Sequence, residues 1–263
     1  MTSSPYRFSL GTSPTDFASF FAPRPGDDQL LALRAADLRD NPSPYAALLP
    51  PSEPLLDETL ELLADWLPPQ VAAAPERHAR LLALGASLVP DLVWLVPEST
   101  SATWIVVGGV VCFPSHWRLT DKLNLPLAMV HDPVPGLNDQ LASLLDRLLA
   151  GLKPHRPLRR WNWGLAASPE PNQHPDRHLP TLSPPFQPDQ TWLRREEQLL
   201  IKLPRSEGVL FGIRIHQMPW AKLLQSPDLR AELVRDLRTM PAPLLAYKRL
   251  DALREDLLAA LQR

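Results

Sequence analysis

One histidine beside a proline-rich turn is the residue of this chain best suited to bind a metal centre. His131 follows the apolar run LPLAMV and precedes the turn DPVPG, which would hold its imidazole at the end of a structural element. A single imidazole is sufficient as the protein ligand of a heme iron. A centre built from several histidines is not expected, because the sequence has no HxH or HExxH pattern. These residues alone leave two readings open for His131: an iron ligand, or a hydrogen-bonded histidine in a turn.

Charged and apolar residues alternate along three predicted strands. Successive residues of a strand point to opposite faces, so Arg160 and Asn162 in RRWNWGL share one face. Arg194 and Glu196 share a face of the next strand, and Arg214 lies opposite an apolar face in GVLFGIRIH. The pattern fits a sheet with one side in water. It fits equally well a concave polar face that is covered by the helices of residues 116–152 and whose buried charges serve a site.

Composition limits the classes of protein and partner. The 263 residues are 44% hydrophobic and 21% charged, which suits one large domain with a sizeable core. A net charge of −2 gives no reason to expect nucleic acid or an anionic membrane as a partner. The single cysteine, Cys112, excludes an internal disulfide and a cysteine-built metal site. The apolar stretches are shorter than the ~20 residues that span a bilayer, and no signal-like segment opens the chain, so we expect a soluble, cytoplasmic protein.

Hydrophobic periodicity predicts an α+β fold. It consists of a mostly antiparallel five-stranded sheet, helices inserted after the second strand, and helical N- and C-terminal extensions. The predicted strands are 91–96, 103–113, 157–165, 191–203 and 208–216. The predicted helices are 54–67, 75–88, short pieces within 116–130, 138–152 with Asn138 as its N-cap, 227–238 and 244–262. We divide the chain into an irregular segment (1–50), a helical region (51–90), a core (91–220) and C-terminal helices (221–263).

Several of these segments together resemble a known family. FPSHWRLTDKLNLPLAMVHDPVPGLN, RWNW and LRREEQLLIKLPRSEGVLFGIRIH, followed by Tyr247-Lys248, are similar in content and order to motifs of the heme-dependent oxidative N-demethylase alpha-subunit-like family. The resemblance spans roughly residues 25–262. It departs from the family pattern at Leu199, where the family has threonine, and at Glu207, where a small residue is usual.

The resemblance implies a fold, a cofactor and roles for particular residues. The fold would be a PAS-like sheet that holds heme b in the 91–220 core, with His131 as the proximal iron ligand. Asn162 and Arg214 would lie on the cofactor. Arg160, Arg194 and Glu196 would be catalytic on the side where oxygen and substrate bind, the arginines by stabilising developing negative charge and Glu196 by handling the proton of an ammonium substrate.

The resemblance also implies a reaction and partners. A heme-dependent monooxygenase of this kind uses O2 to oxidise an N-methyl group of a small secondary amine, which yields formaldehyde and a primary amine. Its electrons come from a separate reductase, because no flavin or NADPH motif occurs in this sequence. Two alternatives stay open: a heme-binding PAS-like sensor or binding module without turnover, and a PAS-like scaffold that has lost heme.

Overall fold

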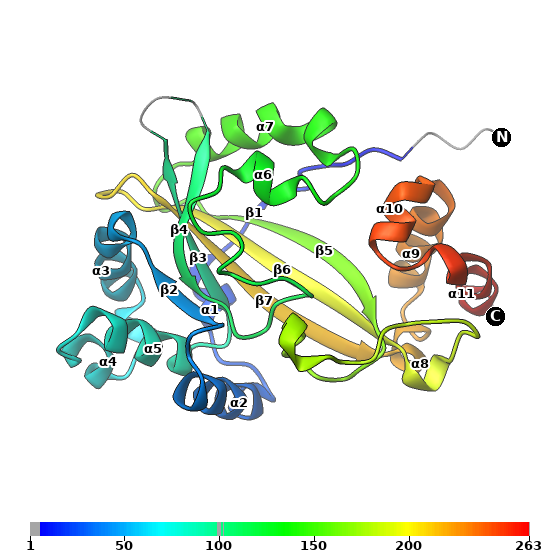
Figure 1. Ribbon diagram of the computed structural model, residues 1–263, viewed down its shortest axis with the longest axis horizontal. Helices are drawn as coiled ribbons and strands as arrows, with labels where there is room; N and C mark the ends of the chain where they lie inside the picture. The colour runs from blue at the N-terminus through cyan, green and yellow to red at the C-terminus, as the bar shows by residue number, and fades with distance from the viewer. Residues whose placement is uncertain (1–5, 99–100, 102, 263) are drawn as a thin grey trace.

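The computed structural model describes residues 6–98, 101 and 103–262 and places seven strands of this part of the chain in one sheet (Figure 1). The strand order is β1-β5-β6-β7-β3-β4-β2, and every pair of neighbours is antiparallel. The strands are β1 (Ser13–Pro14), β2 (Ala46–Leu48), β3 (Asp91–Pro97), β4 (Trp104–Val110), β5 (Leu158–Ala166), β6 (Trp192–Lys202) and β7 (Val209–Pro219).

The mixed, antiparallel class is confirmed, and the count of five strands is wrong. The five predicted strands form the centre of the sheet, and β1 and β2 extend it at its two edges. These edge strands have two and three residues, so they are too short to show a period-two pattern in the sequence. Both lie in the segment 1–50 that we expected to be irregular.

Eleven α-helices surround the sheet in the described part of the chain. They are α1 (Phe17–Phe21), α2 (Asp27–Asp40), α3 (Glu53–Leu62), α4 (Pro69–Ala73), α5 (Arg77–Ser87), α6 (Leu127–His131), α7 (Leu137–Gly151), α8 (Trp220–Leu223), α9 (Pro227–Thr239), α10 (Ala242–Tyr247) and α11 (Arg254–Leu261). As expected, α6 and α7 are inserted between β4 and β5. Figure 1 shows α2–α5 and α9–α11 at opposite ends of the long strands.

Three helical details differ from expectation. The segment 1–50 contains α1 and α2. Helix α2 has a weak apolar pattern because two of its three buried residues, Asp27 and Arg34, are charged. Gly136, with a φ of 73°, occupies the N-cap of α7, while the Asn138 amide donates a 2.8 Å hydrogen bond to the Ala128 carbonyl. The predicted helix 244–262 is interrupted between α10 and α11, where Arg249 has a φ of 57°.

Helices cover both faces of the sheet. We call the face that bears Arg194 and Glu196 the front face, and the face that bears Arg195 and Glu197 the back face. On the front face, α6 and α7 pack on the apolar end of β6 and β7 through the cluster that contains Leu127, Leu149, Leu200 and Val209. On the back face, α1, α2, α3 and α5 cover one end of the sheet, and α8–α11 cover Trp163 and Leu193 at the other. No described helix has the length and apolar character needed to cross a bilayer.

A fully buried ion pair connects the N-terminal helices to the sheet. Arg34 of α2 pairs with Asp91 at the start of β3, and its Nε donates a 2.7 Å hydrogen bond to the Gly85 carbonyl of α5. The Asp91 carboxylate also accepts from the backbone N–H groups of Cys112 and Phe113, at 2.7 and 3.0 Å. Four segments therefore meet at one ion pair, including the chain that leaves β4 toward the front face.

Arg34→Met should lower the free energy of unfolding by about 3 kcal/mol or more, because it leaves a buried carboxylate without its counter-charge. This loss is measured by urea unfolding, with circular dichroism as the readout. The matched control is Arg39→Met in the same helix. Arg39 forms an ion pair with Asp40, and the two side chains are 70% and 66% exposed. We expect the free energy of unfolding to change by about 0.5 kcal/mol or less in this control. Equal effects of the two substitutions would contradict the structural importance of Arg34.

Candidate functional site

Strand pairing brings four of the predicted site residues together on the front face. Asn162 of β5 lies opposite Glu196 of β6, and Gly164 lies opposite Arg194. Arg160 pairs with Gln198 two residues along the same face. Side chains at directly opposed and diagonal positions are within contact distance. The sheet therefore assembles Arg160, Asn162, Arg194 and Glu196 into one polar area beside α6.

Glu196 is the centre of this area. Its Oε1 accepts a 2.7 Å hydrogen bond from the Ser115 hydroxyl. Its Oε2 accepts from the side-chain amides of Gln198 and Asn162, at 2.8 and 3.3 Å. Three donors surround a group that, when ionised, is an acceptor only, so the carboxylate is fixed in position. Asn162 is exposed and Glu196 is half-buried, so this end of the front face is open to a ligand.

Arg194 holds the loop that supplies Ser115. Its NH2 donates to the Phe113 carbonyl at 2.6 Å, its NH1 to the Pro171 carbonyl at 2.9 Å, and its Nε to the Ser115 hydroxyl at 2.9 Å. Burial lowers the pKa of Arg194 to about 10, so the group stays cationic at neutral pH. These contacts make Arg194 a positioning residue for Ser115 and Glu196.

His131 ends α6 on the same side of the sheet as Arg160. Burial, followed by the positive charges of Arg160 and Lys122, lowers the pKa of His131 to about 4. The imidazole is therefore neutral at physiological pH, and one of its nitrogens has a free electron pair. Burial also lowers the pKa of the half-buried Arg160, against the opposing effect of Glu196, and the Arg160 Nε is buried with no hydrogen-bond partner among the described residues.

The C-terminal helices contribute a tyrosine and a lysine to the edge of this area. Burial raises the pKa of Tyr247, and the Glu196 charge adds to the effect. Burial lowers the pKa of Lys248, whose Nζ donates a 2.6 Å hydrogen bond to the Trp163 carbonyl of β5. All three residues belong to motifs that carry the family resemblance: Tyr247 and Lys248 form the Tyr-Lys pair, and Ser115 lies in the FPSHW segment. The contact of Ser115 with Glu196 and that of Lys248 with β5 could not be inferred from spacing, because they depend on how distant segments pack.

Arg214 is the predicted site residue that the structure does not bring to the front face. It pairs with Glu197 across β6 and β7, which places it on the back face. There its NH1 contacts both carboxylate oxygens of Asp27, at 3.0 and 3.1 Å, and its NH2 donates to the Ala22 carbonyl. The expected contact with the cofactor is thus replaced by a buried bond to the start of α2. The alternation along β7 already indicated this placement. The apolar face of β7 is part of the front face, and Arg214 lies on the opposite face.

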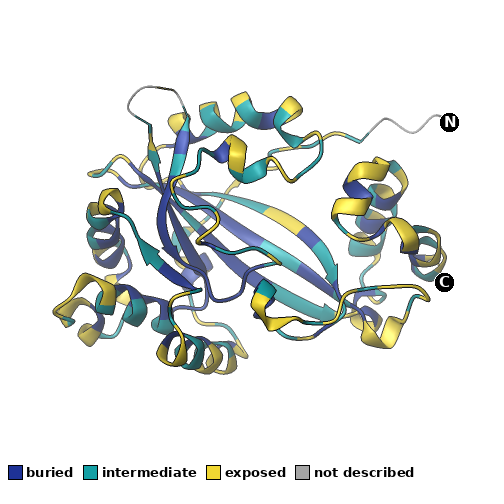
Figure 2. Cartoon of the chain, in the orientation of Figure 1, coloured by how far each residue is buried: buried dark blue, intermediate teal, exposed yellow. Residues whose placement is uncertain are grey.

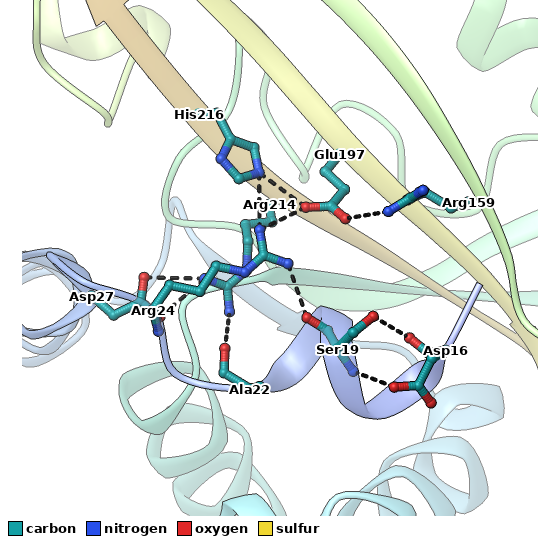
Figure 3. Close-up of polar contacts among 9 residues, drawn as sticks. All are labelled: Asp16, Ser19, Ala22, Arg24, Asp27, Arg159, Glu197, Arg214 and His216. Carbon is teal, nitrogen blue, oxygen red and sulfur yellow. Dashed lines mark hydrogen bonds and ion pairs between the residues drawn. The ribbon is translucent and has the colours of Figure 1, made fainter.

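A second polar cluster on the back face is centred on Glu197 (Figure 3). One of its carboxylate oxygens is 2.8 Å from the Arg24 NH1 and 3.0 Å from the His216 Nε2, and the other is 3.6 Å from the Arg159 NH1. Burial by itself would raise the pKa of Glu197, but hydrogen bonds from His216 and Arg24 outweigh it and lower the pKa to about 2. Two adjacent glutamates therefore form two separate networks on opposite faces.

The described side chains suit a heme iron better than a metal ion held by several protein ligands. No group of three or more His, Cys, Asp or Glu residues with metal-binding geometry occurs among the residues that the structure describes. Burial raises the pKa of Cys112 to about 12, so its thiol stays protonated and is a poor ligand. The neutral His131 is a candidate for the iron, and one protein ligand is sufficient for heme.

Glu197→Gln should remove a pH-dependent part of the stability. A carboxyl whose pKa falls from 4.5 to about 2 on folding stabilises the protein fully above pH 4.5. This contribution, about 3 kcal/mol from linkage, is lost as the pH falls toward 2. Unfolding free energies measured between pH 7 and pH 3 should therefore fall less in Glu197→Gln than in the wild type. Glu61→Gln, at an exposed carboxylate, is the control. Parallel curves for wild type and Glu197→Gln would show that the network does not lower this pKa.

Comparison with known families supports the resemblance noted in the sequence. Residues 70–258 match the family described as Haem-dependent oxidative N-demethylase, alpha subunit-like. The matched range contains His131, the front-face residues Arg160, Asn162, Arg194 and Glu196, and Tyr247-Lys248. The family's description refers to a heme-dependent oxidase and to one subunit of a larger assembly. The match covers more than half of the chain, which therefore belongs to the heme-dependent oxidative N-demethylase alpha-subunit-like family.

Proposed function

We propose that this protein is the heme-binding subunit of an O2-dependent N-demethylase that acts on a small secondary amine. The observation that carries the proposal is the family match over residues 70–258, because it contains every residue of the front-face polar area. The geometry supports it: four residues chosen from the sequence lie on one face, and the fifth, His131, ends a helix beside them. We further propose that the 91–220 core is PAS-like, with residues 1–90 and 221–263 as extensions.

His131 and Arg160 are the residues that we assign to the heme. His131 would bind the iron through a neutral imidazole, which its low pKa favours. The buried Arg160 Nε has no hydrogen-bond partner among the described residues, so it fits a ligand that brings an acceptor to this point. Asn162, exposed on the same face, would contact the ligand on the substrate side. Heme b, when bound, supplies the O2-dependent oxidation that amino-acid side chains cannot perform.

Glu196 is the residue that we assign to the amine. A carboxylate on an open part of the front face attracts a secondary ammonium ion and can accept its proton before oxidation. Ser115 and Gln198 hold both carboxylate oxygens in place, so little orientational freedom is lost when substrate binds. The Arg194 Nε donates a hydrogen bond to the Ser115 hydroxyl and so holds Ser115 in position. Oxidation of the N-methyl group would then yield formaldehyde and a primary amine, with electrons from a separate reductase.

His131→Ala should abolish heme binding while the protein stays folded. We expect at least a tenfold fall in the Soret absorbance per protein after purification with added heme. His78→Ala, at an exposed histidine of α5, is the matched control and should keep the wild-type spectrum. A wild-type spectrum in His131→Ala would overturn the assignment of His131 to the iron.

Glu196→Gln should keep heme but slow turnover. The substitution preserves size and removes the negative charge, so we expect formaldehyde release from dimethylamine to fall about 100-fold, within the usual range for loss of a general base. The assay needs NADPH and an added reductase, and Glu61→Gln is the control. Unchanged kinetics would remove Glu196 from the mechanism. Heme-loaded wild-type protein without formaldehyde release over a panel of methylamines would instead favour a binding module.

A further inference from the structure

The back face of β5 carries an exposed tryptophan between basic side chains. The guanidinium of Arg195 lies 4.3 Å from the centre of the Trp161 ring, and that of Arg159 lies 5.9 Å from it. The His216 ring is 5.5 Å from the same tryptophan. Trp161 is 37% exposed, whereas Trp163, two residues along the same face, is 7% exposed under the C-terminal helices. Figure 2 shows an exposed stretch of β5 between residues of intermediate and full burial.

We call the surface formed by Arg24, Arg159, Trp161, Arg195 and His216 the Trp161 patch. Glu197 is the only carboxylate that forms described ion pairs with the side chains of the patch; it is buried and binds Arg24 and His216 (Figure 3), while the backbone N–H of Arg24 donates to Asp27, whose carboxylate is paired with Arg214. Arg195 has no carboxylate within 4.0 Å in the described part of the chain. Three guanidinium groups therefore face one carboxylate, in a protein whose net charge is −2. The patch is a local positive area on a weakly acidic molecule.

Stability of the fold does not explain this arrangement. An exposed cation–π contact contributes only about 0.5–1 kcal/mol. The helical layers cover the back face on both sides of the patch, with Leu199 buried at one end and Leu193 at the other, but they leave Trp161 accessible. Tryptophan and arginine are the residue types most enriched among those that dominate binding energy at protein interfaces. Glu197 holds two of the basic groups in fixed positions, which lowers the entropy lost on binding.

We propose that the Trp161 patch docks an acidic protein that delivers electrons to the site on the front face. This inference rests on the proposed function, which requires a separate electron donor. If His131 and Arg160 hold heme as proposed, the donor's redox centre would lose one electron and the heme would gain it. The position of the patch fits this role because adjacent residues of β5 point to opposite faces. Trp161 lies between Arg160 and Asn162, so one layer of sheet separates the docked partner from the candidate site.

Charge also distinguishes this partner from two others. In a twofold contact between copies of this chain the patch would face itself, and the basic groups would repel one another. A nucleic acid needs an extended basic track, whereas this patch is compact and has a carboxylate at its centre. An acidic protein surface matches the sign of the patch.

An acidic plant-type ferredoxin in its oxidised form is a suitable probe, because its binding requires neither heme nor turnover. We expect binding to the wild-type protein at low ionic strength, measured by titration calorimetry, and about a tenfold weaker affinity for Trp161→Ala. Arg195→Glu should slow association about tenfold, because reversed charge acts mainly on the encounter rate. Arg147→Glu, at an exposed arginine of α7, should bind like the wild type. Circular dichroism verifies that all variants are folded.

Three results of the ferredoxin titrations would overturn the docking proposal. The first is the absence of ferredoxin binding at low ionic strength. The second is an equal affinity for the wild type and both patch variants. The third is a loss of affinity in Arg147→Glu as large as that in the patch variants. Tighter binding of a single-stranded oligonucleotide that Trp161→Ala abolishes would also overturn it, in favour of nucleic acid. The visible spectrum after heme addition tests the proposed function separately. Patch-dependent ferredoxin binding by a chain that takes up no heme would refute the proposed function and, with it, the electron-delivery role.

Discussion

The alternation of side chains along β6 is the constraint on which the rest of the site depends. The sequence RREE places Arg194 and Glu196 on the front face and Arg195 and Glu197 on the back face. A shift of one residue in register would exchange the two networks and also turn the apolar residues Leu199 and Ile201 away from their core. The long pairings of β6 with β5 and β7 fix this register, so packing of the core and placement of the charges are specified together.

Buried arginines join these faces to distant parts of the chain. Arg34 connects α2 and α5 to the start of β3, and the same carboxylate binds the backbone of Cys112 and Phe113. Arg194 binds the next residues of that segment and directs Ser115 to Glu196. A continuous set of polar contacts thus runs from α2 to the candidate site. Each buried charge has partners for most of its hydrogen-bonding groups, as the cost of desolvation requires.

Two polar networks on one sheet give each face a different role in our proposals. The front network is centred on a half-buried carboxylate beside the exposed Asn162, which suits a small cationic ligand. The back network buries its carboxylate and leaves cations and a tryptophan at the surface, which suits an acidic protein. A single β-sheet can serve a heme-dependent oxidation on one side and electron delivery on the other, because its side chains alternate and its backbone is only one layer thick.

The sequence by itself determined the five central strands, the insertion of α6 and α7, and the residues that share a face within one strand, Arg160 with Asn162 and Arg194 with Glu196. These features follow from period-two and period-3.6 patterns, which are local and repeated. Only the tertiary structure decided the edge strands β1 and β2, the helix α2, the burial of Arg214 against Asp27, the contact of Ser115 with Glu196 and that of Lys248 with the Trp163 carbonyl. Short strands and a helix that buries charged residues leave no periodic pattern. Contacts between residues 80 or more positions apart depend on how whole elements pack, which no local spacing records.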